Sequence, residues 1–151
     1  MQAQDFMKKD VITINQDISI VDASIILMNN KITGAPAVDS KKNLVGVISE
    51  KDIFKKIYPN YQEYYFSLEV KDKPNKDLKN QIKEAKSIKV KDIMTKNVIS
   101  AKPSDSAMKI GAIMLIKKIN RVIIVDNGRL AGIVSRKEIF PQSFKKALEN
   151  N

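Results

Sequence analysis

One stretch of this chain occurs twice, and the repetition limits what the chain can fold into. Residues 44–54 read LVGVISEKDIF, and residues 130–140 read LAGIVSRKEIF. Each copy is typical of a short buried strand that runs directly into a helix, with Ser49 or Ser135 at the junction. The N-terminus of such a helix presents unpaired N–H groups and a partial positive charge, which favour an anion or a polar ligand.

The repeat extends well beyond this stretch. Residues 5–54 align with residues 92–140 when one residue near Lys41 is skipped, and 17 of the 49 aligned positions are identical. Such similarity indicates an internal duplication. A unit of about 50 residues buries too little surface to be robust alone, so we expect the two repeats to pack on each other. The sequence predicts a first repeat at 1–57, a Tyr- and Lys-rich linker at 58–90, and a second repeat with a C-terminal helix at 91–151.

The pattern of apolar residues predicts the order β-α-β-β-α in each repeat, in a mixed α/β or α+β fold with small sheets covered by helices. In the first helix we interpret Ile18, Val21, Ile25 and Met28 as one apolar face. The corresponding helix of the second repeat is apolar all round, which predicts burial by a second unit or a second chain and a core position for Met108 and Met114. Pro141 predicts a break before a separate short helix at 142–148. The predicted elements are strands at 11–14, 35–38, 44–48, 98–101, 121–125 and 130–134, and helices at 17–30, 49–57 and 105–118 and from 135 onward.

The composition excludes several kinds of chemistry. The chain has no His and no Cys, so a Ser-His-Asp triad, a Cys nucleophile and the usual zinc sites are excluded. Neither the P-loop pattern nor G-x-G-x-x-G occurs. We therefore expect no enzyme, no metal site and no obligatory cofactor, while a carboxylate-only or magnesium-dependent enzyme stays open.

The net charge of +10 suggests an anionic partner, which could be a nucleotide, nucleic acid, an acidic protein or a membrane surface. No apolar run is long enough to span a membrane, and the N-terminus lacks the apolar core of a signal peptide. We therefore expect a cytoplasmic protein without membrane insertion. The tyrosines and lysines of the linker could stack bases and bind phosphates. Alternatively, the linker is a connector that lays its aromatic side chains over the groove between the repeats.

The repeated motifs resemble those of the cystathionine-β-synthase (CBS) domain in its paired form. The family often shows D-h-M at the start of a unit, matched here by residues 5–7 and 92–94. Its central h-P-h-V-D pattern is matched by residues 34–39, and its G-h-h-[ST]-x-x-[DN] by residues 46–52. The resemblance covers about 100 residues, and two ordered copies at the right spacing make it specific.

The resemblance implies a stand-alone regulatory module and no enzyme. Paired CBS domains form a pseudo-twofold unit, also called a Bateman module, whose clefts between repeats often bind AMP, ADP, ATP or S-adenosylmethionine. Two pairs commonly associate, so the resemblance implies a homodimer that senses an adenine nucleotide, for example as an energy sensor, and signals to a regulated protein of unknown identity. Two alternatives stay open: a nucleic-acid-binding protein on a CBS scaffold, and a structural dimerisation module with vestigial clefts.

Ser49 and Asp52 lie one helical turn apart, so the hydroxyl can bind a phosphate and the carboxylate can accept hydrogen bonds from two ribose hydroxyls. The same S-x-x-D spacing also fits an ordinary capping box at the start of a helix. By analogy with the family, the adenine wall comes partly from backbone groups of four further residues, which are Thr13, Gly34, Ala35 and Pro36.

The second copy departs from the family pattern. Glu138 replaces Asp, and Ile123 stands where the first copy has Pro36. Arg121 occupies a position where the family often has a phosphate-binding arginine, and a guanidinium can hold phosphate with two hydrogen bonds. We therefore expect two unequal sites, of which the second is altered, empty or biased toward phosphate. The candidate residues of the second site are Ser100, Arg121, Ile123, Ser135, Arg136 and Glu138.

Overall fold

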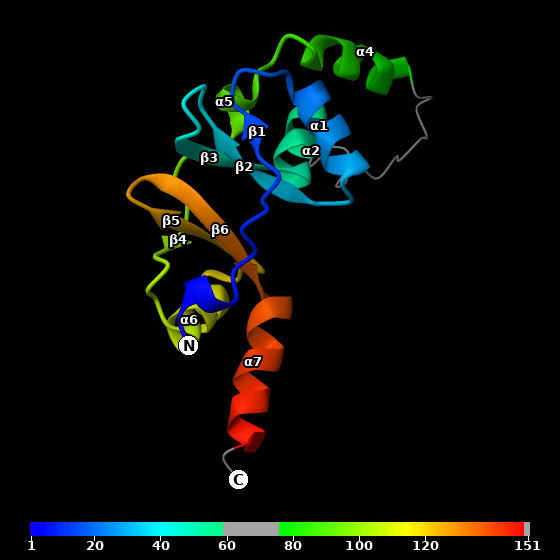
Figure 1. The fold of residues 1–151 in the computed structure, drawn as a ribbon. Coiled ribbons are helices and arrows are strands. Elements are labelled where there is room, and N and C mark those ends of the chain that lie inside the picture. Colours follow the sequence, from blue (N-terminus) through cyan, green and yellow to red (C-terminus); the bar gives the residue numbers. More distant parts are fainter. Residues whose placement is uncertain (59–75, 150–151) are drawn as a thin grey trace, which may run out of the picture. The chain divides into compact units, whose positions relative to one another are not determined.

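The computed structural model of the chain describes residues 1–58 and 76–149. Each repeat has the predicted order β-α-β-β-α and contributes one sheet of three strands (Figure 1). The elements are, in chain order, η1 (Ala3–Asp5), β1 (Ile14–Asn15), α1 (Ile20–Asn29), β2 (Gly34–Val38), β3 (Leu44–Ser49), α2 (Glu50–Ile57), α4 (Lys76–Ala85), α5 (Val90–Ile93), β4 (Ser100–Ala101), α6 (Ala107–Lys117), β5 (Arg121–Asp126), β6 (Arg129–Ser135) and α7 (Arg136–Glu149).

The chain forms two compact units that are not contiguous in sequence. Unit 1 consists of residues 1–12 and 42–44 with the described residues from 97 onward, and unit 2 consists of residues 13–41 with the described residues of 45–96. The segment before the first strand of each repeat thus belongs to the unit that holds the other repeat's sheet. We call residues 1–12 the N-terminal lead-in and residues 86–96 the central lead-in.

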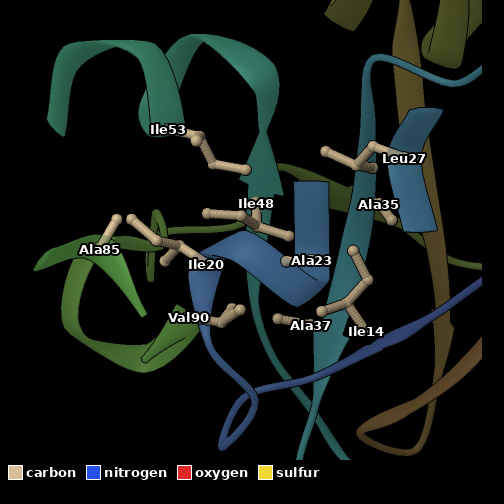
Figure 2. Packing of buried hydrophobic residues seen from close by; sticks show 10 residues of the cluster. All are labelled: Ile14, Ile20, Ala23, Leu27, Ala35, Ala37, Ile48, Ile53, Ala85 and Val90. Atoms are coloured by element: carbon tan, nitrogen blue, oxygen red, sulfur yellow. The ribbon is translucent and has the colours of Figure 1, made fainter. Parts of the chain in front are cut away.

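Unit 2 is built on the sheet β1-β2-β3, in which β1 and β2 run parallel with Ile14 opposite Ala37. The helix α1 begins after Ser19, whose Oγ accepts a hydrogen bond from the Asp22 N–H at 3.0 Å, as expected of an N-cap. Val90 of the central lead-in is fully buried in this core. Figure 2 shows the cluster of buried side chains, which consists of Ile14, Ile20, Ala23, Leu27, Ala35, Ala37, Ile48, Ile53, Ala85 and Val90.

Unit 1 is built on the sheet β4-β5-β6, in which β4 and β5 are parallel and β5 and β6 form an antiparallel hairpin. Asn127 and Gly128 both have positive φ, at 48° and 79°, as a type I′ hairpin turn requires. The helix α6 packs on β5, and α7, which continues directly from β6, contacts α6 (Figure 1). The buried cluster consists of Ala3, Ala101, Ile110, Met114, Val122, Ile124 and Val134.

A glycine in each sheet lets a lead-in approach closely. A Cβ atom on Gly46 would lie 2.7 Å from the Met94 Sδ and 2.9 Å from the Thr95 carbonyl oxygen. A Cβ atom on Gly132 would lie 2.8 Å from both the Met7 Sδ and the Lys8 carbonyl oxygen. The methionine of D-h-M therefore packs against the glycine of G-h-h-S, in unit 2 as in unit 1.

Some details of the helices differ from the sequence predictions. The helix α7 continues through Pro141, so the predicted separate helix is wrong. Proline has no backbone N–H, so the helix lacks one hydrogen bond at this position. The ring centroids of Phe140 and Phe144, on either side of Pro141, lie 4.5 Å apart. Met114 is buried as predicted, whereas Met108 is 82% exposed.

The apolar face predicted for α1 is also wrong in part. The helix buries Ile20, Ala23 and Leu27 and leaves Ile25 and Met28 exposed. Because α1 carries apolar residues on more than one side, helical spacing alone could not decide which stripe faces the sheet.

Candidate functional site

The first candidate site forms where β3 passes into α2. Ser49 is the N-cap of α2, and its Oγ accepts a hydrogen bond from the Asp52 N–H at 3.2 Å. In return, Asp52 Oδ2 accepts from the Ser49 N–H at 3.0 Å and from the Ser49 hydroxyl at 2.9 Å. The capping box that the S-x-x-D spacing allows is therefore formed.

The cap uses only one of the two carboxylate oxygens. Both hydrogen bonds that the Asp52 side chain accepts end on Oδ2, and no described residue lies within hydrogen-bond or salt-bridge distance of Oδ1. The side chain is partly exposed. An ionised carboxylate oxygen can accept two hydrogen bonds, so Asp52 can stabilise its helix and still accept donors from a ligand.

The other predicted residues of the first site occupy different environments. Gly34 lies against the site, because a Cβ atom on it would be 3.4 Å from the Ser49 Cβ. Thr13 is exposed and directly precedes β1. The side chains of Ala35 and Pro36 are buried, and Ala35 belongs to the core of unit 2. In this structure Ala35 can offer a ligand its backbone groups only.

In the second candidate site, in unit 1, the carboxylate also accepts two hydrogen bonds from the serine that precedes its helix, and it has a further partner. Glu138 Oε2 accepts hydrogen bonds from the Ser135 N–H at 2.7 Å and from the Ser135 hydroxyl. Glu138 Oε1 lies 3.3 Å from the Nζ of Lys8 in the N-terminal lead-in. Burial raises the pKa of the Glu138 carboxyl, but the Ser135 hydrogen bonds and the Lys8 ammonium outweigh burial and hold the pKa below its ordinary value.

The sheet brings most of the remaining second-site residues together. Arg121 is directly opposite Ser135 in the β5–β6 ladder, and Ser100 is opposite Ile123 in the β4–β5 ladder. Arg121 is exposed and has an interaction partner, and Ile123 is 6% exposed. Arg136 is the exposed first residue of α7.

Lys8 is the residue that sequence reasoning missed. In the repeat alignment it corresponds to Thr95, directly after D-h-M, so the two lead-ins differ by a positive charge at this position. The difference in charge could be read from the sequence. The ion pair with Glu138 could not, because Lys8 and Glu138 are far apart in the chain and meet only in the folded protein.

A surface hollow of about 450 Å³ in unit 2 lies apart from these residues and is lined by Lys51, Phe54, Lys55 and Tyr58 of α2 and its C-cap. None of the predicted ligand-binding residues lines it. The Asp52 carboxylate provides the stronger chemical argument, because the hollow is open and carries no group in a specific polar geometry. The part of the linker at 59–75 lies outside the described residues.

Within residues 1–58 and 76–149, no cluster of three or more acidic side chains is arranged to hold a metal ion. No described helix is both long and apolar enough to cross a membrane.

Comparison with protein families identifies the class. The model of the CBS domain matches residues 3–59 and 90–142, more than half of the chain. The chain therefore belongs to the CBS domain family, and both repeats are CBS domains, as the motifs predict.

Individual relatives agree with this assignment. An uncharacterised protein of Methanocaldococcus jannaschii is 33% identical over 150 residues, covering 92% of this chain and 89% of the relative. Inosine-5'-monophosphate dehydrogenase of the same organism is 30% identical over 139 residues, covering 91% of this chain but only 23% of the enzyme.

Solved structures share the fold. The CBS domain pair of protein MJ0100, in complex with 5'-methylthioadenosine and S-adenosyl-L-methionine, has a TM-score of 0.70 at 27% identity, covering 97% of this chain and 98% of that one. CBSX2, a CBS-pair protein of Arabidopsis thaliana, in complex with AMP has a TM-score of 0.73 at 23% identity, with 97% and 98% coverage.

Proposed function

We propose that this protein is a regulatory CBS pair that binds an adenosine ligand at the Asp52 site. The observation that carries the proposal is the Asp52 carboxylate, which is held at the start of α2 through Oδ2 while Oδ1 has no partner among the described residues. A carboxylate in this state accepts hydrogen bonds from the two adjacent hydroxyls of a ribose, and such charge-assisted bonds are strong.

The surroundings of Asp52 support a ribose in particular. The absence of a side chain at Gly34 leaves room beside Ser49, where an arginine stands at the equivalent position of the second repeat. Of the related CBS pairs, CBSX2 binds AMP, and the pair of MJ0100 binds 5'-methylthioadenosine and S-adenosyl-L-methionine. The candidate ligands are therefore AMP, ADP, ATP and S-adenosylmethionine.

Signalling follows if the ligand prefers one conformation of the protein over another. We propose that binding changes how the protein contacts a regulated partner and that the chain itself performs no chemical reaction. In the enzyme relatives the matching region is a minor part of the length, about a quarter of inosine-5'-monophosphate dehydrogenase.

The test is calorimetric titration with AMP, ATP and S-adenosylmethionine. Asp52→Asn should weaken binding at least tenfold, because it removes the charge from a hydrogen-bond acceptor worth about 1.5–3 kcal/mol. Asp22→Asn is the matched control, since Asp22 has the same S-x-x-D spacing to the N-cap Ser19 of α1. The control should bind like the wild type. Absence of binding by the wild type at millimolar ligand would overturn the proposal.

We also propose a homodimer, because unit 1 has a large apolar helix surface. Met108, Leu115 and Ile116 of α6 are 82%, 75% and 75% exposed, and Phe140 and Phe144 of α7 are 63% and 56% exposed. Side chains of this size are rarely left in water together. Leu115→Glu should convert a dimer to a monomer in size-exclusion chromatography with light scattering, whereas Lys117→Glu should leave the dimer intact. A wild-type monomer would contradict this proposal.

A second candidate function, nucleic-acid binding, has one observation in its favour. Phe54 and Tyr58 stack with ring centroids 5.9 Å apart, and Lys51 and Lys55 flank them. Aromatic rings beside lysines are typical of single-strand binding surfaces. This function predicts affinity for single-stranded RNA that falls steeply with salt and is lost in Phe54→Ala. RNA binding that persists in Phe54→Ala would remove this surface from consideration.

A further inference from the structure

The two equivalent carboxylates differ in how many of their oxygens are engaged. Asp52 uses Oδ2 alone, and its Oδ1 has no partner among the described residues. Glu138 uses both oxygens, Oε2 for Ser135 and Oε1 for the Lys8 ammonium at 3.3 Å. The Glu138 side chain is 14% exposed.

The backbone holds Lys8 in this place. The Lys8 N–H donates to the Ile133 carbonyl at 2.9 Å, and the Ile133 N–H donates to the Lys8 carbonyl at 2.9 Å. Ile133 precedes Ser135 by two residues on β6, so a side chain as long as lysine reaches the start of α7. Met7 reinforces the contact by packing against Gly132.

Unit 2 has the same backbone arrangement with a different side chain. Thr95 exchanges two hydrogen bonds of 2.9 Å with Val47, which precedes Ser49 by two residues. Threonine is uncharged and short, and Thr95 makes no ion pair with Asp52. The two sites therefore have the same backbone arrangement but differ in the charge and length of the side chain at this position, and in having Asp52 or Glu138 as the carboxylate.

We propose that Lys8 is a specificity-determining residue that closes the Glu138 site to ribose and limits the protein to one adenosine ligand per chain, at Asp52. This inference rests on the proposed function. The Lys8 ammonium occupies one of the two acceptor positions of Oε1, so a ribose cannot place both of its hydroxyls on this oxygen. A neutral hydroxyl is also a weaker donor to a carboxylate than an ammonium is. The first-repeat lead-in thus decides the ligand preference of the second repeat.

The substitution needed for the test is mild. The Lys8 side chain is 65% exposed, and exposed ion pairs contribute little to stability. Lys8→Thr introduces the residue of the equivalent position, and Lys8→Met retains most of the apolar stem without the charge. Lys9→Thr is the control, since Lys9 is exposed, has no ion-pair partner in the described chain and carries the same charge.

The experiment is calorimetric titration with adenosine, which has a ribose but no phosphate that could be attracted by Lys8 or Arg121. The background is Asp52→Asn, in which the first site is weakened at least tenfold. We expect only this weakened binding in Asp52→Asn alone or with Lys9→Thr, and one tightly bound adenosine per chain when Lys8→Thr or Lys8→Met is added. In the otherwise wild-type chain, Lys8→Thr should raise the stoichiometry from one to two.

Two results would overturn the inference: adenosine binding at Glu138 while Lys8 is present, or no gain of binding in both folded Lys8 variants. Failure of the proposed function is distinguishable, because it appears as a wild-type protein that binds no adenosine ligand at Asp52. In that event the Lys8 variants still test whether Lys8 closes the Glu138 site, since a gain of one site supports the closure and no gain overturns it.

Discussion

At the scale of single residues, the Glu138 carboxylate links two distant parts of the chain to each other. Its pKa lies below the ordinary value because Ser135 and Lys8 favour the charged form more than burial disfavours it. A group with a lowered folded-state pKa stabilises the protein above its unfolded pKa, and this contribution is lost as the pH falls through the folded-state pKa. The stabilisation by Glu138 should therefore be complete at neutral pH and disappear in acid.

Glu138→Gln tests this dependence. The wild type should be more stable than the variant by about 1 kcal/mol at pH 7, because a hydrogen bond to a charged group contributes about 1.5–3 kcal/mol and one between neutral groups about 0.5–1.5 kcal/mol. The difference should shrink below about pH 4.3, the unperturbed glutamate pKa. Urea unfolding across this range measures it. The pKa of Asp105 is also lowered, by the backbone N–H of Lys102 and the Lys109 side chain. Because Asp105 is present in both the wild type and the variant, its effect cancels in the difference between their stabilities. Equal differences at pH 3 and pH 7 would contradict the prediction.

In each site the serine and the carboxylate that follows it could be predicted from the sequence. The contact with a residue from a distant part of the chain could not. The S-x-x-D and S-x-x-E spacings predicted a carboxylate beside each N-cap serine, because a helical turn fixes that geometry. The engagement of Oε1 by Lys8 depends on a lead-in that pairs with a strand about 125 residues away. Periodicity within one repeat has no access to such pairing.

At the scale of elements, the pairing of lead-in and sheet explains why D-h-M and G-h-h-S occur together in both repeats. Gly46 contacts Met94 and Gly132 contacts Met7, so each motif requires the other for close packing. The strands β1 and β4 are shorter than predicted. Residues 11–12 and 98–99 continue the β-branched run, but the hydrogen-bonded strands begin only at Ile14 and Ser100.

Alanine substitutions of glycines test this close packing, because they should lower the stability of the protein at two positions and raise it at a third. Gly46→Ala and Gly132→Ala should each destabilise the protein by about 1–3 kcal/mol, the usual cost of overpacking, because the new methyl group meets backbone oxygen. Gly111→Ala should stabilise it by about 0.5–1 kcal/mol, since Gly111 lies inside α6 with nothing within 4 Å of an added Cβ. Thermal unfolding of the three variants measures this. A stable Gly132→Ala protein would show that the lead-in has room to move.

At the scale of the whole molecule, the class of fold could be predicted from the sequence, whereas the assignment of residues to the two compact units could not. The duplication and its β-α-β-β-α order were visible because they are local patterns that occur twice. The exchange of lead-ins between units was not, because either repeat could have kept its own. The exposed apolar stripe of α6 was visible as a pattern, but periodicity could not separate burial within the chain from burial by a second chain.

The exchange predicts which unit a truncation damages. Removing residues 1–12 should loosen unit 1, because it deletes the buried Ala3 and the hydrogen bonds to Ile133 and Asp105. Hydrogen exchange followed by mass spectrometry should show lost protection in β6 and the start of α6. Protection of β3, which pairs with Thr95, should remain. Lost protection in unit 2 with unit 1 unchanged would contradict the assignment of the lead-in.

The N-terminal lead-in also sets the order in which the protein can be completed during synthesis. Translation proceeds at about 5–20 residues per second, so roughly 6–25 s pass between the emergence of Lys8 and that of its partner Ile133. Throughout this interval Ala3 and Met7 have no native surface to cover them. Unit 2 needs no residue beyond 96 and can close first. The N-terminal lead-in therefore leaves the ribosome before unit 2 is complete and reaches its native contacts only after that unit can close.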